Sequence, residues 1–341
     1  MHSFAPRRFF IVLAVLFSAH SCSAPSDNSI YLLLLSSNSS FGHTTQCDFS
    51  NISHELVYDG TPEITNGWQD ITFGEGRFVA VADSGTKRAL SSTDGETWVT
   101  SEVPEQNSWS AVAYGNGQFV AVATSGTNRT MLSANGINWT AHPAAEQNTW
   151  TAITYGNGIF LAVASNGTNQ AMTSVDGINW NARSMPAGKW RHVGYGNGKF
   201  VATAIGADPH SLAVSEDGWN WSTYSVPVNM GPAAPIFGPG RIVIPGSTEV
   251  SHSTNGSDWI YETINLPMGV EGRGAYAHGA YVAVGEYNNL AISNSGEIWT
   301  KPDSYKGGGN WASLAYGNGV FIATRHLGGD GFGSVYSLKC P

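Results

Sequence analysis

The chain has 341 residues and a formal net charge of −9, and only 12% of its residues are charged. It contains 41 Gly and 12 Trp without long stretches of Ala, Leu, Glu and Lys, a composition that favours short strands joined by tight turns over helices. Because an acidic chain without a basic stripe has little with which to neutralise phosphates, we expect no nucleic-acid partner.

Residues 1–22 have the features of an export signal. Arg7 and Arg8 form a positive region, an apolar run of eleven residues (9–19) follows, and small residues come next. The apolar run is too short to cross a bilayer. Its end, Ala19-His20-Ser21-Cys22, resembles the lipobox of bacterial lipoproteins, which implies that Cys22 is lipidated and is the first residue of the mature chain.

The lipobox resemblance also implies a location. Ser23 after the cysteine implies sorting to the outer membrane of a Gram-negative cell, with membrane contact only through the lipid. His20 departs from the small or apolar residue usual at its position. The alternative is cleavage by an ordinary signal peptidase after Ser21 or Ala24, which predicts a periplasmic or secreted protein.

Residues 23–46 are rich in Ser and Asn, which predicts a solvated tether between the signal and the folded part of the chain. A short apolar run at residues 30–35 interrupts it and is too brief for a membrane span. We therefore place the folded domain within residues 47–341.

One sequence unit recurs seven times in that domain. It consists of Trp, a short segment, Tyr-Gly-Asn-Gly, a run such as Phe-Val-Ala-Val-Ala, a polar loop and Ser-x-Asp-Gly-x-x-Trp. The units are spaced by 39 to 42 residues, and their opening positions are Trp68, Trp109, Trp150, Trp190, Pro232, Glu271 and Trp311. A period of this length with four strands per unit is typical of a β-propeller blade.

The chemistry of each unit divides it into four strands, A to D. Strand A starts at the opening Trp, and the Asn-Gly pair makes the tight turn to strand B because it supplies the positive φ angles that such turns need. Strand B is the buried apolar run, and the Asp-Gly pair marks the turn from strand C to strand D. The sequence thus predicts an all-β, seven-bladed β-propeller with four antiparallel strands per blade.

The seventh unit ends without a fourth strand, whereas residues 55–59 precede the first unit and carry a strand-like sequence. We therefore expect residues 55–59 to pair with residues 335–339, so that the N-terminal strand closes the last blade. This closure brings Cys47 and Cys340 into one blade, and an exported protein can hold a disulfide between them. Two unrelated free thiols, or a pair formed by Cys22 and Cys47, are the alternatives.

The Asp-Gly-x-x-Trp segments resemble the Asp-box, or bacterial neuraminidase repeat, of exported bacterial propellers. The Asp-box has one more residue between Asp and Gly, so this is a shortened Ser-x-Asp-Gly-x-x-Trp variant that supports the fold more than the superfamily. The resemblance implies a structural role for the acidic residue of the turn and for the closing Trp. These positions are Asp94, Asp176, Asp217, Trp98, Trp139, Trp180, Trp221, Trp259 and Trp299, with Asn135 and Asn255 as equivalents of the acidic residue.

The sequence predicts no catalytic residue. A sialidase needs three arginines on the substrate carboxylate, a Tyr and Glu nucleophile pair and an Asp acid/base. Here only Arg191 and Arg273 fall on inner strands, whereas Arg77 and Arg241 lie in A–B turns, opposite the usual site. Metal-binding spacings of His or Cys and a Gly-x-Ser-x-Gly elbow are also missing, so we expect no metal and no cofactor.

Variable loops point instead to binding. The A–B turns repeat monotonously, whereas the B–C and D–A loops on the opposite face vary, and recognition usually resides in variable loops on a rigid scaffold. We expect ligand contacts from loop residues on this face, unless those residues are merely solvated. The loop candidates are Lys87, Arg88, Asn128, Arg129, Asp208 and His210.

Three further candidates share one position on strand A that is otherwise Ala or Ser. Asp70, His192 and Arg273 form either a polar channel mouth or a buried ion pair that only satisfies itself. The function hypothesis is a monomeric, non-enzymatic binding propeller of the cell envelope that engages glycan or protein through its loop face. The alternatives are a scaffold in envelope assembly and a glycoside hydrolase or lyase with paired carboxylates in one cavity.

Overall fold

The computed structural model describes residues 49, 52–59, 66–205, 211–225, 233–246, 249–264, 273–285, 289–302, 310–326 and 333–339. Contacts divide the chain into residues 1–44 and 45–341, and the described residues belong to the second unit. Cys22, Cys47, Cys340, Asp208 and His210 lie outside the described residues, so the lipid and disulfide remain predictions. In the described part of the chain, no helix is long and apolar enough to span a membrane.

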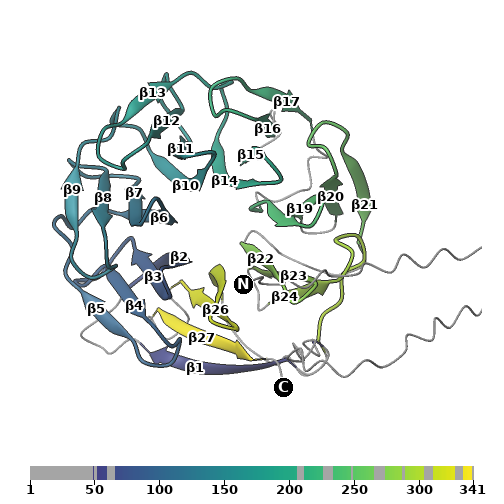
Figure 1. Cartoon of the computed structure of the whole chain (residues 1–341), viewed down its shortest axis with the longest axis horizontal. Helices are drawn as coiled ribbons and strands as arrows, with labels where there is room; N and C mark the ends of the chain where they lie inside the picture. Colours follow the sequence, from purple (N-terminus) through teal and green to yellow (C-terminus); the bar gives the residue numbers. More distant parts are fainter. Residues whose placement is uncertain are drawn as a thin grey trace, which may run out of the picture. The chain divides into compact units, whose positions relative to one another are not determined.

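The described strands form seven antiparallel sheets arranged in a ring (Figure 1). Blade one contains β2 (Trp68–Gly74), β3 (Arg77–Ala82), β4 (Ala89–Ser92) and β5 (Val99–Ser101). Blade two contains β6 (Trp109–Gly115), β7 (Gln118–Ala123), β8 (Thr130–Ser133) and β9 (Thr140–His142). Blade three contains β10 (Trp150–Gly156), β11 (Ile159–Ala164), β12 (Ala171–Ser174) and β13 (Asn181–Arg183). Blade four contains β14 (Trp190–Gly196), β15 (Lys199–Ala204), β16 (Leu212–Ser215) and β17 (Ser222–Tyr224).

The remaining blades continue the ring. Blade five contains β18 (Ile236–Gly238), β19 (Arg241–Pro245), β20 (Glu249–Ser253) and β21 (Ile260–Thr263). Blade six contains β22 (Gly274–Ala277), β23 (Ala280–Gly285) and β24 (Asn289–Ser293). Blade seven contains β25 (Trp311–Gly317), β26 (Val320–Arg325), β27 (Ser334–Lys339) and β1 (Ser53–Asp59).

The predicted closure is confirmed. Strand β1 pairs antiparallel with β27, with Ser53 opposite Lys339 and Asp59 opposite Ser334. The strand begins two residues earlier than the sequence predicted, and Figure 1 shows the N-terminal strand on the outer edge of the last blade. The ring is thus closed by hydrogen bonds between the two ends of the domain.

Blade six departs from the predicted pattern. Among its described residues the fourth strand is represented by one bridge, in which Ile292 and Thr300 exchange two backbone hydrogen bonds of 2.9 Å. The closing Trp residues also precede the outer strands instead of lying within them, as Trp98 does before β5. The outer strands therefore begin just after the closing Trp, whereas the sequence predicted that they contain it.

The Tyr-Gly pair of the repeat joins neighbouring blades. A Cβ atom on Gly115 would lie 2.0 Å from Cγ of Tyr155 in the next blade, and one on Gly156 would lie 2.0 Å from Cγ of Tyr195. The joint continues across the closure, where a Cβ on Gly317 would lie 2.2 Å from the ring of Phe73. Glycine is required here because an aromatic ring occupies the space that a side chain would need.

The Asn-Gly pair has a second function besides the turn. Asn116 adopts a φ of 48° and Gly117 a φ of 75°, as the tight turn requires. The Asn side chains reach the C–D turn of the next blade, where Asn116 Nδ2 donates to the Val175 carbonyl at 3.3 Å and Asn318 Nδ2 to the Thr93 carbonyl at 2.8 Å. The repeat therefore encodes contacts between blades as well as the blades themselves.

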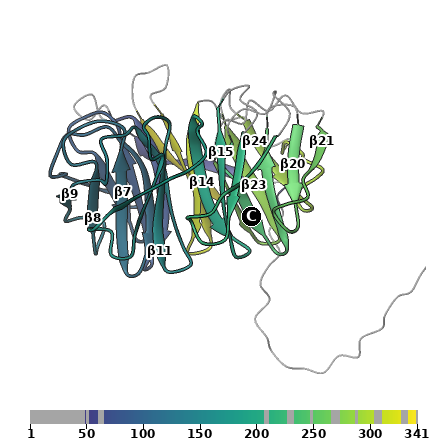
Figure 2. The ribbon, with the colours of Figure 1, turned by 90° about the horizontal axis from the view of Figure 1, so that it is seen from above.

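The hydrophobic core lies between blades. The opening residues Trp68, Trp109, Trp150 and Trp190 are fully buried. Each packs with strands from adjacent blades, as Trp109 does with Val79 and Val81 of blade one. Seen from the side, the strands run between two faces of the ring, so the A–B turns lie on one face and the described B–C and D–A loops on the other (Figure 2).

Candidate functional site

The C–D turns are held by local hydrogen bonds. Asp94 Oδ1 accepts from the N–H of Glu96 at 2.8 Å and of Thr97 at 2.7 Å, and Ser92 Oγ accepts from the N–H of Gly95 at 2.8 Å. The indole of Trp98 donates to the Gly95 carbonyl at 3.3 Å. Asn135 and Asn255 make the same contacts through their side-chain oxygens. These side-chain oxygens hold the turn.

The same hydrogen bonds lower the pKa values of the three turn aspartates, Asp94, Asp176 and Asp217. Backbone N–H donors hold the pKa values of Asp94 and Asp176 far below their ordinary value. For Asp217, burial raises the pKa, but the N–H groups of Asn220 and Trp219 outweigh this and lower it to about 2. All three turns therefore contain a carboxylate at neutral pH.

Arg88 and Arg129, two of the predicted loop contacts, use their guanidinium groups to fix the loops. Arg129 donates to the carbonyls of Gly126, Thr124, Gln147 and Asn148 at 2.7 to 3.3 Å. Arg88 makes the equivalent four contacts in blade one. Each guanidinium thus ties a B–C loop to the D–A loop that follows it.

Asn128 and Lys87 belong to the same loop framework. Asn128 donates from its amide to Glu105, and its carbonyl accepts from Asn107 Nδ2 at 2.6 Å. The Lys87 carbonyl accepts from Asn66 Nδ2 at 2.6 Å. Burial raises the pKa of Glu105, but its Asn128 and Asn107 donors outweigh burial and lower the pKa. These contacts build the rim of the loop face.

A polar pocket lies at the propeller axis on this face. Its volume is about 430 Å³, and its lining comes from six of the seven blades. The lining residues lie at the first positions of A strands and just beyond the ends of B strands, which places the pocket among the B–C and D–A loops. A well-formed concave pocket with convergent polar groups is the default place to look for a ligand.

A β-bulge directs one residue per blade into this pocket. In five blades the pairing register shifts immediately after the opening Trp, so that the following residue is the extra one. Bulges re-aim side chains and are frequent beside functional sites. The five bulged residues all line the pocket and are Gln69, Ser110, Thr151, Arg191 and Ala312.

Asp70 and Arg273 form the ion pair that the sequence left as one of two alternatives. Arg273 Nη1 lies 2.8 Å from Asp70 Oδ2, and Ser313 Oγ donates to Asp70 Oδ1 at 2.7 Å. The N–H groups of Val112 and Ile71 also donate to this carboxyl, at 2.9 Å each. Burial raises the pKa of Asp70, while Arg273 and these donors oppose the rise.

The ion pair connects blades one and six below the pocket floor. Arg273 and His192 line the pocket, and His192 is buried. The strand-A position that Asp70, His192 and Arg273 share therefore supplies both an ion pair and part of a polar pocket. Asp70 and Arg273 also line a second cavity of about 240 Å³, to which all seven blades contribute. The pair thus stands between two cavities on the axis.

The pocket also holds an Asp and His pair. Asp83 Oδ2 lies 3.6 Å from His326 Nε2 and accepts from Gln69 Nε2 at 2.8 Å. Burial raises the pKa of Asp83, but hydrogen bonds from His326 and Ser84 and the charges of His326 and Arg88 lower it below the ordinary value. Among the described lining residues of this pocket, Asp83 is the single carboxylate, so the paired carboxylates of a glycoside hydrolase are not found there.

Sequence reasoning missed Gln69, Asp83 and the bulged Ser110 and Thr151. The residue after each opening Trp varies more than its neighbours, and this variation is the signal that could have revealed them. In the ranges that the structure describes, no three His, Cys, Asp or Glu side chains gather to hold a metal ion.

The fold and this pocket define the chain as a seven-bladed β-propeller with a polar cavity at one end of its axis. No protein-family model matches the chain, and no curated protein matches it.

Solved structures share the fold. A streptogramin B lyase has a TM-score of 0.70 and 13% identity, covering 85% of this chain and 98% of the other. A catalytically inactive histidine-to-alanine variant of virginiamycin B lyase from Staphylococcus aureus with quinupristin has a TM-score of 0.68 and 12% identity, covering 84% and 99%. YCF48 from Cyanidioschyzon merolae has a TM-score of 0.62 and 14% identity, covering 84% and 98%. At these identities the likeness shows the propeller fold alone.

Proposed function

We propose that this protein is an exported, non-enzymatic binding propeller of the cell envelope that takes the polar end of a glycan in its axial pocket. The observation that carries the proposal is the row of bulged residues, which converge from five blades on one cavity. Two of the bulged hydroxyls also join neighbouring blades, because Ser110 Oγ donates to the Trp150 carbonyl at 2.7 Å and Thr151 Oγ1 to the Trp190 carbonyl at 2.9 Å. The bulged residues therefore line the cavity from a rigid position.

The chemistry of the lining supports a saccharide. Gln69, Ser110 and Thr151 offer amide and hydroxyl groups, and Arg191 adds an exposed cation. Hydroxyl-rich ligands need many short polar contacts of both kinds, donor and acceptor. The fixed loops around the pocket reduce the entropy that would be lost on binding.

A glycan array followed by calorimetry of the strongest ligand tests this proposal. We expect Arg191→Ala to weaken binding by about 10-fold or more, as loss of a charged hydrogen bond predicts. Arg77→Ala removes the same charge from an A–B turn on the opposite face and is the matched control. An array without any ligand, or equal binding by Arg191→Ala and wild type, would contradict the proposal.

Lyase activity is the second candidate, because His326 and Asp83 form a potential base and orienting carboxylate inside the pocket. The fold of the streptogramin B lyase structures adds to this candidate. Incubation with quinupristin, followed by chromatography, separates the two functions. Consumption of quinupristin that His326→Ala abolishes would establish a lyase, whereas unchanged quinupristin would leave binding as the function.

A further inference from the structure

A slot recurs between neighbouring blades on the side of the C–D turns. The turn of one blade lies over strands of the preceding blade: a Cβ on Gly218 would lie 2.7 Å from Leu161, and one on Gly256 would lie 2.7 Å from Lys199. One side of the slot is formed by the third residue after the closing Trp of one blade. The other side is formed by the residue that follows the Gly of the C–D turn in the next blade. Two adjacent slots can therefore be compared position by position.

Between blades three and four the slot is filled from within. Trp219 follows the turn Gly of blade four, and the guanidinium of Arg183 in β13 lies over its ring at 5.1 Å from the centroid. Arg183 is fixed in turn, because its Nε donates to Thr173 Oγ1 at 2.9 Å. The Trp219 side chain is 42% exposed, so a flat ring covers this slot from the solvent side.

Between blades four and five the same slot is open. Tyr224 of β17 replaces Arg183, since Tyr224 pairs with Leu212 as Arg183 pairs with Ala171. Ser257 replaces Trp219 after the turn Gly. The exchange of an indole for a hydroxymethyl group leaves a cavity of about 410 Å³, lined by both Tyr224 and Ser257.

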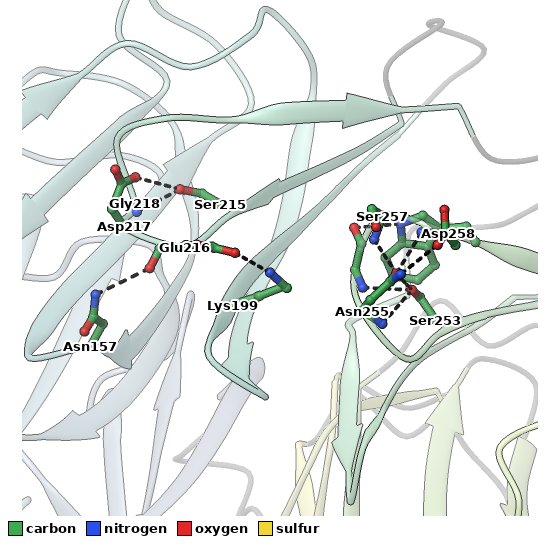
Figure 3. Close-up of polar contacts among 12 residues, drawn as sticks. Asn157, Lys199, Ser215, Glu216, Asp217, Gly218, Ser253, Asn255, Ser257 and Asp258 are labelled. Carbon is green, nitrogen blue, oxygen red and sulfur yellow. Dashed lines mark hydrogen bonds and ion pairs between the residues drawn. The ribbon is translucent and has the colours of Figure 1, made fainter.

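The charged groups at this open slot carry a net charge of −1. Lys199 Nζ lies 2.6 Å from Glu216 Oε1 across its edge (Figure 3). Asp217 and Asn220 also line the slot. The side chain of Glu216 is 78% exposed, so this pair can also meet a ligand from solvent. A lining with one ammonium and two carboxylates does not favour a phosphate or carboxylate ligand.

Polar groups surround one aromatic ring in this slot. Ser222 and Ser257 provide hydroxyls, Asn220 and Asn255 provide amides, and Tyr224 provides a partly buried ring. The turn around Asn255 is fixed by its contacts with Ser257 and Asp258, so this wall is preformed (Figure 3). An aromatic face with donors and acceptors around it suits a ring that has apolar C–H faces and hydroxyl edges.

We propose that the open slot between blades four and five is a second binding site, which takes a neutral sugar ring in the place that Trp219 occupies one blade earlier. The sugar stacks a C–H face on Tyr224 and directs its hydroxyls to Lys199 and Glu216. The site lies at the blade periphery among C–D turns, and it does not depend on the axial pocket or on the function proposed for that pocket.

Saturation-transfer NMR on the full-length protein tests this site. The probes are glucose, galactose, mannose and N-acetylglucosamine, at concentrations suited to dissociation constants on the order of millimolar. We expect at least one of them to receive saturation from the protein. Ser257→Trp fills the slot as blade four fills the preceding one. In an Arg191→Ala background, which weakens the axial pocket, we expect it to abolish the remaining signal while the thermal midpoint stays within a few degrees of that background.

Two further variants keep the proposal falsifiable if Ser257→Trp folds poorly. Tyr224→Leu keeps apolar bulk without an aromatic ring and should weaken sugar binding at least about 5-fold. Arg191→Ala weakens only the axial pocket, so a signal should persist in it that Ser257→Trp then removes, which separates this site from the axial one. Absence of signal from all four sugars, or an undiminished signal in both slot variants, would overturn the proposal.

Discussion

Alanine in place of Gly115 tests how the repeat joins its blades. The added Cβ would lie 2.0 Å from Cγ of Tyr155, where unstrained carbon contacts need about 3.5–4.0 Å. The Tyr155 ring cannot simply withdraw, because it packs on Phe160 with centroids 4.8 Å apart. Overpacking of this kind costs about 1–3 kcal/mol, and the severity of the overlap predicts a loss near 3 kcal/mol in the free energy of unfolding.

Urea denaturation followed by tryptophan fluorescence measures this loss, and a second substitution identifies its cause. In a Tyr155→Ala background the ring is gone, so adding Gly115→Ala should cost less than about 0.5 kcal/mol. Gly117→Ala is the control for backbone strain, because its φ is 75° and its Cβ would meet nothing within 4 Å. If Gly115→Ala lowers the free energy of unfolding by the same amount in the Tyr155→Ala background as in the wild type, the overlap with the Tyr155 ring is not the cause and the reasoning is refuted.

Three further predictions concern charged groups. The three turn aspartates have lower pKa values in the folded state than in the unfolded state, so the stabilisation that they give is complete above about pH 5 and is lost as pH falls toward 2. Urea titrations at several pH values measure this loss. We expect the pH dependence of the free energy of unfolding to shrink when all three aspartates are replaced by Asn. Asp70→Asn breaks a buried ion pair with Arg273 and should lower the free energy of unfolding by about 3–5 kcal/mol, measured by the same denaturation; a loss under 1 kcal/mol would contradict this. Arg129→Ala should cost about 1–2 kcal/mol and speed amide exchange in residues 124–129, with no rescue by Arg129→Lys, because one ammonium cannot reach four carbonyls.

The fold could be predicted because each blade repeats its own turn chemistry. Asn116 and Gly117 mark an A–B turn wherever they recur, and the count of strands in the seventh unit left one missing, which pointed to β1. The outer strand of blade six was overestimated, since among the described residues after Trp299 a single one, Thr300, is paired. A repeat motif specifies the turn but not how far the edge strand continues beyond it.

The site was harder to predict because it depends on pairing and on backbone partners. The bulge at Gln69 is defined by what lies opposite in β3, so the sequence shows this position only indirectly, through the variation after the opening Trp. Arg88 and Arg129 have the composition of ligand contacts, but their donors are directed at carbonyl groups that no pattern of side chains reveals. The shared position of Asp70 and Arg273 was visible, because polar residues replace Ala or Ser there.

Hydrogen–deuterium exchange with and without a glycan found by the array tests the central claim most directly. If the axial pocket binds the ligand, protection should appear at residues 82–84, 190–192 and 324–326, which surround the pocket on three blades. Protection confined to the A–B turns, or to blade edges away from the axis, would contradict the claim that the bulged residues form a binding site.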